Sequence, residues 1–197
     1  MKTKNASHKN IKFYLVNGIT IYRLLAAPIL ISLIFTNHIN LFKWLLSLSF
    51  FTDLMDGFLA RRLKVASIWG AKLDSIADDF TIIAAIIGLW VFKLEFIKQQ
   101  MELIIALLLL FITQTTYALI KYKRITSFHT YLAKISATLQ GTFLICIFLF
   151  PHPILPLFYV ATLFTTIELA EEIILISMLK KWEANVKGLY WVIKRKK

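Results

Sequence analysis

Six long apolar segments dominate the sequence, and each is long enough to cross a lipid bilayer as a helix. Crossing the hydrocarbon core takes about 20 mostly apolar residues. Inside lipid, only helices and closed barrels satisfy every backbone amide. The candidate spans are residues 14–36, 41–61, 69–92, 101–120, 131–150 and 154–179. We therefore predict an all-α integral membrane protein with six transmembrane helices.

The composition supports lipid as the surrounding solvent. The 197 residues are 58% hydrophobic, whereas soluble domains average roughly 45–50%. The net charge is +12, and most of the basic residues lie between the apolar spans. An anionic membrane surface therefore explains this charge, and we expect no nucleic-acid partner. The single cysteine, Cys146, lies in an apolar span, which excludes a disulfide framework and a cysteine-based metal site.

The basic residues also predict the orientation of the chain. With the N-terminus inside, 17 of the 23 Lys and Arg residues fall on the inner side. Because basic residues favour the cytoplasmic side, we expect both termini to be cytoplasmic. We further expect basic interfacial segments at 1–13 and 180–197 to flank one membrane domain at 14–179. A disordered basic tail is the alternative for 180–197.

All five aspartates of the chain lie between Asp53 and Asp79, where the second span ends and the third begins. An aspartate at the centre of a membrane helix costs about 2.5–3.5 kcal/mol. Helical spacing places Asp53 and Asp56 on one face, and Asp74 and Asp78 on another. A short basic turn joins the two spans. The four carboxylates of these two pairs can therefore meet at one depth, just below the cytoplasmic surface.

Four carboxylates at close range repel one another, and two divalent cations would neutralise them. Oxygen ligands suit Mg²⁺, Mn²⁺ or Ca²⁺ better than Zn²⁺. Paired metals typically clamp phosphoryl oxygens during a displacement reaction. The alternative is a set of salt bridges to the neighbouring basic residues Arg61, Arg62, Lys64 and Lys72. We favour metal, because unneeded acids are expensive in apolar surroundings.

These acids belong to a longer pattern of fixed spacing, D-x2-D-G-x2-A-R-x8-G-x3-D-x3-D. Its fixed positions are Asp53, Asp56, Gly57, Ala60, Arg61, Gly70, Asp74 and Asp78. The pattern resembles the signature of the CDP-alcohol phosphatidyltransferase family at every fixed position. The resemblance implies an enzyme of phospholipid biosynthesis that transfers a phosphatidyl group from CDP-diacylglycerol to an alcohol and releases CMP. It also implies a homodimer.

The resemblance assigns roles to the pattern. The ligands of two divalent cations, Mg²⁺ or Mn²⁺, would be Asp53, Asp56, Asp74 and Asp78. Asp78 would also be the candidate base that takes the proton from the acceptor hydroxyl. The nucleotide would contact Gly57, Ala60, Arg61 and Gly70. Helix packing in the membrane explains the two glycines equally well.

Three polar residues recur in the first span at Asn17, Thr20 and Arg23. Similar N-x2-T-x2-R elements open many family members. This implies that Asn17 and Thr20 line the nucleotide cavity and that Arg23 helps to bind the acceptor. The alternative for Arg23 is a salt bridge to an acid of the second or sixth span.

Arg124 and Lys134 are further candidates for acceptor binding, since an intramembrane lysine indicates function. Residues 133–138 loosely resemble a G-K-x-K-T element of phosphatidylglycerophosphate synthases, with Ser136 in place of the second lysine. Those enzymes also tend to carry lysine where this chain has Asp79. Glycerol-3-phosphate is the leading acceptor, and phosphatidylglycerol, serine and an inositol phosphate stay open.

The sixth span contains Glu168, Glu171 and Glu172. We expect these acids to pair with Arg23, Lys72 or Lys134, or to shape the acceptor pocket. An acid-lined membrane transporter is the alternative function from another class, but transporter sites usually involve broken helices and repeated halves. A non-catalytic scaffold is the third reading, and it would not need aspartates at these spacings.

Overall fold

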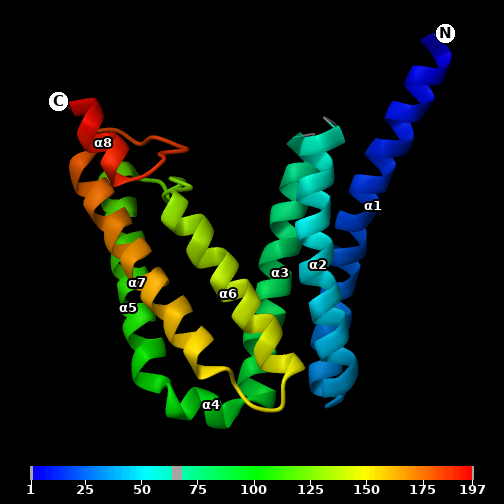
Figure 1. Ribbon diagram of the computed structural model, residues 1–197, viewed down its shortest axis with the longest axis horizontal. Helices are drawn as coiled ribbons and strands as arrows, with labels where there is room; N and C mark the ends of the chain where they lie inside the picture. Colours follow the sequence, from blue (N-terminus) through cyan, green and yellow to red (C-terminus); the bar gives the residue numbers. More distant parts are fainter. Residues whose placement is uncertain (1, 64–67, 197) are drawn as a thin grey trace. The chain divides into compact units, whose positions relative to one another are not determined.

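A computed structural model describes the backbone of residues 2–63 and 68–196, and it is helical with one isolated β-bridge in that part of the chain (Figure 1). The side chains of 2–17, 54–63, 68–72, 74–75 and 196 lie outside the description. The helices are α1 (Lys2–Phe35), α2 (Ile39–Leu63), α3 (Ile68–Phe92), α4 (Leu94–Gln99), α5 (Met101–Tyr122), α6 (Tyr131–Leu149), α7 (Leu155–Met178) and α8 (Leu189–Lys196).

Each of the six predicted spans corresponds to one of the long helices. Three stretches of the described residues are long and apolar enough to cross a membrane: Gly18–Phe35, Met101–Tyr122 and Tyr131–Leu149. Large apolar side chains stay exposed along α5, among them Leu108, Leu109 and Phe111. Such a surface suits lipid rather than water. The chain is therefore an integral membrane protein, and the count of six crossings stays a prediction.

The N-terminal basic segment does not form a separate element. Helix α1 begins at Lys2 and continues to Phe35, so residues 2–13 extend the same helix that carries the first predicted span. Pro28 lies inside this helix. Whether residues 1–13 contact a membrane surface stays a prediction.

The chain divides into two compact units, residues 1–94 and residues 95–197. In unit 1, α1 packs against both α2 and α3, and α2 also contacts α3. Small side chains allow this close approach, including the buried residues Ala26, Ala27, Ala77, Ala84 and Ala85. Gly88 of α3 gives room to the ring of Phe42, because a Cβ at residue 88 would lie only 2.4 Å from Phe42 Cζ.

In unit 2, α7 packs against both α5 and α6. Where α5 and α7 end, Lys121 Nζ donates to the carbonyl of Ile176 at 2.6 Å, and Tyr122 Oη donates to that of Leu179 at 2.8 Å. These donors satisfy carbonyls that the last turn of a helix leaves open. The C-terminal ends of α5 and α7 therefore lie side by side.

The segment 180–197 is folded over the part that the structure describes, rather than a disordered tail. Trp182 Nε1 donates to the carbonyl of Ile125 at 3.0 Å, and Ser127 pairs with Ala184 in a parallel β-bridge. Val192 of α8 is buried in a hydrophobic cluster that includes Leu175 of α7. These contacts argue against the disordered alternative, and the interfacial position of the segment stays a prediction.

Candidate functional site

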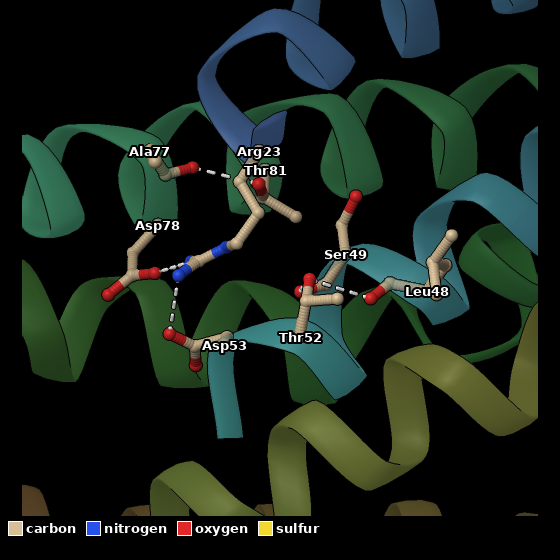
Figure 2. A network of polar contacts seen from close by, with 8 residues as sticks. All are labelled: Arg23, Leu48, Ser49, Thr52, Asp53, Ala77, Asp78 and Thr81. Atoms are coloured by element: carbon tan, nitrogen blue, oxygen red, sulfur yellow. Dashed lines mark hydrogen bonds and ion pairs between the residues drawn. The ribbon is translucent and has the colours of Figure 1, made fainter. Parts of the chain in front are cut away.

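Arg23 lies at the centre of unit 1 and connects three helices (Figure 2). Its side chain is only 1% exposed. One terminal nitrogen, Nη1, lies 2.8 Å from Asp53 Oδ1 on α2. The other, Nη2, forms an ion pair with Asp78 Oδ1 on α3. A planar guanidinium suits this task, because its fork of donors can bind two carboxylates at once.

The carboxylates of Asp53 and Asp78 are partly exposed at the edge of this cluster. Their side chains are 34% and 36% exposed, whereas Arg23 is buried behind them. Asp53 and Asp78 are thus held in place by one internal cation while part of each carboxylate stays accessible. This confirms one expected alternative, a salt bridge from Arg23 to an acid of the second span. The pairing with Asp78 of the third span was not among the expected pairings.

The hydroxyl groups near this cluster are satisfied within their own helices. Thr81 Oγ1 donates to the carbonyl of Ala77 at 2.8 Å, and Ser49 Oγ donates to that of Leu45 at 2.9 Å. Thr52 Oγ1 makes a similar bond to the carbonyl of Leu48. Thr20, one turn before Arg23 on α1, is buried. These side chains make the interior of unit 1 polar at the level of the aspartates.

The remaining residues of the signature lie on the same helices, but their side chains are outside the description. Helix α2 contains Asp56, Gly57, Ala60 and Arg61, and α3 contains Gly70 and Asp74. Asn17 belongs to α1 and is outside it as well. The backbone confirms that both aspartate pairs are helical, so each pair shares a helix face as expected. The roles of these residues stay predictions.

Asp53 and Asp78 fit a hard divalent cation, because their carboxylate oxygens converge from two helices and are partly accessible. Among the side chains that the structure describes, no three His, Cys, Asp or Glu residues gather closely enough to hold a metal ion. Asp56 and Asp74, which complete the predicted ligand set, lie outside that search. The metal centre stays a prediction.

The predicted acceptor residues of unit 2 are exposed. The guanidinium of Arg124 lies over the ring of Trp182, 5.7 Å from its centroid, in the turn between α5 and α6. Lys134 Nζ lies 5.5 Å from the centroid of the Tyr131 ring at the start of α6. Cation–π contacts of this kind are compatible with binding a phosphate, because the cations keep their charge. Their role in acceptor binding stays a prediction.

The glutamates of α7 make contacts other than the expected pairs with Lys134 or Arg23. Glu172 accepts hydrogen bonds from Gln114 at 2.5 Å and from Thr126 at 3.0 Å. Glu171 accepts the backbone N–H of Leu189 at 2.8 Å. Neutral donors in the same unit thus bind one carboxylate oxygen of Glu171 and one of Glu172. Gln114, which is 2% exposed, was missed by sequence reasoning because a neutral amide in an apolar span carries no charge signal.

Comparison with known proteins decides the family. A family model described as CDP-alcohol phosphatidyltransferase matches residues 13–176, which is most of the chain. The chain belongs to the CDP-alcohol phosphatidyltransferase family. This match covers α2 and α3 with their aspartates, and also the helices of unit 2 through most of α7. No solved structure matched the chain.

Two curated relatives resemble parts of this chain. A CDP-diacylglycerol–glycerol-3-phosphate 3-phosphatidyltransferase of Cereibacter sphaeroides is 39% identical over 75 residues, or 36% of this chain and 34% of the relative. A cardiolipin synthase (CMP-forming)/mitochondrial hydrolase fusion protein of Schizosaccharomyces pombe is 38% identical over 66 residues, or 34% of this chain and 11% of the relative. The matched regions thus span about a third of one relative's length and about a tenth of the other's.

Proposed function

We propose that the protein transfers the phosphatidyl group of CDP-diacylglycerol to an alcohol and releases CMP. The observation that carries this proposal is the convergence of Asp53 and Asp78 within a complete family signature. The family match over residues 13–176 supports the same reaction class. A lipid-linked substrate also suits an integral membrane protein, because its acyl chains can stay in the bilayer.

Two divalent cations, Mg²⁺ or Mn²⁺, would be held by Asp53, Asp56, Asp74 and Asp78. When bound, they supply positive charge that stabilises the charge developing on the pyrophosphate oxygens. The protein's own contribution is to fix the carboxylates. The buried Arg23 fixes two of them. Its two terminal nitrogens bind Asp53 and Asp78 and limit how far either side chain can turn.

In the reaction, Asp78 takes the proton from the acceptor hydroxyl as that oxygen attacks the phosphorus of the phosphatidyl group. One phosphorus–oxygen bond forms to the acceptor, and the bond to the bridging pyrophosphate oxygen breaks. The electron pair of the broken bond leaves with CMP. Residues Asn17, Thr20, Gly57, Ala60, Arg61 and Gly70 would contact the nucleotide.

Glycerol-3-phosphate is the acceptor that we favour. The Cereibacter sphaeroides relative carries this acceptor in its name, and a phosphorylated acceptor would give a role to the exposed cations Arg124 and Lys134. The Schizosaccharomyces pombe relative is named a cardiolipin synthase, which keeps phosphatidylglycerol as an alternative. Serine and an inositol phosphate are further alternatives.

The proposed setting is a cytoplasmic active site in a six-span homodimer whose basic segments contact anionic lipids. The three apolar helices and the charge of +12 support the membrane part of this proposal. Mass measurement of the detergent-solubilised protein would test the dimer, and a purely monomeric species would contradict it.

Release of CMP by the purified protein tests the function. With CDP-diacylglycerol and Mg²⁺ or Mn²⁺, we expect release that depends on glycerol-3-phosphate and stops when EDTA is added. Asp78→Asn should lower kcat about 10²- to 10⁴-fold, because a general base is lost. Asp79→Asn is the matched control, since Asp79 is exposed and outside the signature. Equal activity of the Asp78→Asn and native proteins would refute the role of Asp78.

A further inference from the structure

The C-terminal cap, residues 180–195, is attached where two membrane-crossing helices meet the interface. The N–H of Asn185 donates to the carbonyl of Ser127 at 3.0 Å, and that of Tyr131 donates to the carbonyl of Lys187 at 3.2 Å. Both bonds join the cap to the turn between α5 and α6, which are candidate spans. In Figure 1, α8 lies at the same end of unit 2 as this turn. The cap therefore lies at a membrane boundary.

Contacts with α7 and with Tyr131 of α6 hold helix α8 in a defined orientation. Glu171 Oε1 of α7 accepts the N–H of Leu189 in the first turn of α8 at 2.8 Å. A carboxylate at this position also interacts favourably with the helix dipole. Val192 is buried against the α7 cluster, and the ring centroids of Trp191 and Tyr131 lie 5.3 Å apart. Tyr190, Ile193 and Lys194 of α8 stay exposed.

The exposed surface of α8 and of the rest of the cap is apolar, aromatic and positively charged. Tyr190, Trp191 and Ile193 are 65%, 44% and 43% exposed. The exposed basic side chains of the described cap are Lys180, Lys181, Lys187, Lys194 and Arg195. The acid among these residues, Glu183, is paired with Arg195 at 2.9 Å. Exposed aromatic rings beside basic residues are typical of helices that lie in the membrane interface.

We propose that the C-terminal cap is a preformed anchor that binds α8 to an anionic lipid leaflet. Tyr190 and Ile193 insert at the level of the headgroups, and the lysines interact with the negatively charged lipid phosphates. The excess of basic over acidic side chains favours an anionic leaflet over a neutral one, since each lysine near such a surface contributes attraction. This anchor depends on the membrane position of α5 and α6 and is independent of the transferase reaction.

Amide hydrogen exchange of residues 189–195 tests the anchor in the full-length protein. The protein is placed in nanodiscs of phosphatidylcholine alone or of phosphatidylcholine mixed with phosphatidylserine, without CDP-diacylglycerol. We expect slower exchange of α8 in the anionic nanodiscs, and loss of this difference in high salt. In Lys187→Gln/Lys194→Gln, the lipid-dependent slowing should fall roughly fivefold for each lysine removed.

Lys98→Glu is the matched control, because it removes the same total charge at the other end of α5 and should leave α8 exchange unchanged. Tyr190→Ser should weaken the slowing while keeping its salt dependence. Equal exchange in neutral and anionic nanodiscs would overturn the proposal. Equal protection in detergent micelles and in both nanodiscs would also overturn it, since a protein surface would then cover α8.

Discussion

At the scale of single residues, Arg23 shows how a membrane protein tolerates clustered acids. A buried charge is stable only when it is paired, and Arg23 meets this condition by binding carboxylates from two other helices. The same contact holds two residues of the family signature at fixed positions. Arg23 thus acts on the site in two ways, as a counter-charge and as a positioning residue.

We expect Arg23→Ala to lower the free energy of unfolding by about 2–4 kcal/mol when no metal is present. Breaking a fully buried ion pair costs about 3–5 kcal/mol, and the partial exposure of Asp53 and Asp78 reduces this value. Added Mg²⁺ should restore part of the loss, because a divalent cation can replace the missing charge. Thermal unfolding in detergent, with EDTA or with Mg²⁺, measures both effects.

Arg195→Ala is the control for this prediction. Its ion pair with Glu183 lies on the surface, so its loss should change the free energy of unfolding by at most about 1 kcal/mol. If Arg23→Ala and Arg195→Ala lowered the stability equally, the proposed importance of the buried pair would be wrong.

At the scale of helices, the spacing of the aspartates predicted the structure better than the charge of the glutamates predicted their partners. The intervals between Asp53 and Asp56 and between Asp74 and Asp78 predicted two helices with shared faces, and α2 and α3 contain them. The partners of Glu172 could not be predicted, because Gln114 and Thr126 are neutral and lie 58 and 46 residues away. The folded cap could not be predicted either, because backbone groups make several of the hydrogen bonds between the cap and the α5–α6 turn.

The contact between α2 and α3 gives a prediction at this scale. Gly88→Ala should lower the free energy of unfolding by about 1–3 kcal/mol, because overpacking forces a buried ring to move. The ring of Phe42 is fully buried and lies 5.4 Å from that of Phe92 between centroids, so it has little freedom to shift. Thermal unfolding again provides the measurement.

Gly18→Ala is the matched control, because a Cβ there would meet nothing within 4 Å. The double variant Gly88→Ala/Phe42→Leu should recover part of the loss by making room for the new methyl group. Full stability of Gly88→Ala alone would mean that α2 and α3 adjust at no cost.

At the scale of the whole molecule, the number of crossings determines where the chain ends. Six crossings return the C-terminus to the side of the N-terminus, whereas the three most apolar helices alone would place the termini on opposite sides. We expect reporters fused to either end to be cytoplasmic, because basic residues gather at both ends. Protease protection in inverted vesicles measures this, and a protected C-terminal reporter beside an accessible N-terminal one would refute it.

The position of α7 between α5 and α6 has a consequence for biosynthesis. Helices α5 and α6 are made first, yet α7 supplies the partners of their buried polar groups: Glu172 for Gln114, and Thr165 for Ser136 at 2.9 Å. Polar groups in hydrocarbon are costly until they are paired. Unit 2 can therefore reach its final packing only once α7 has packed against α5 and α6. A chain released from the ribosome before α7 would present these side chains to lipid and become a substrate for quality-control proteolysis.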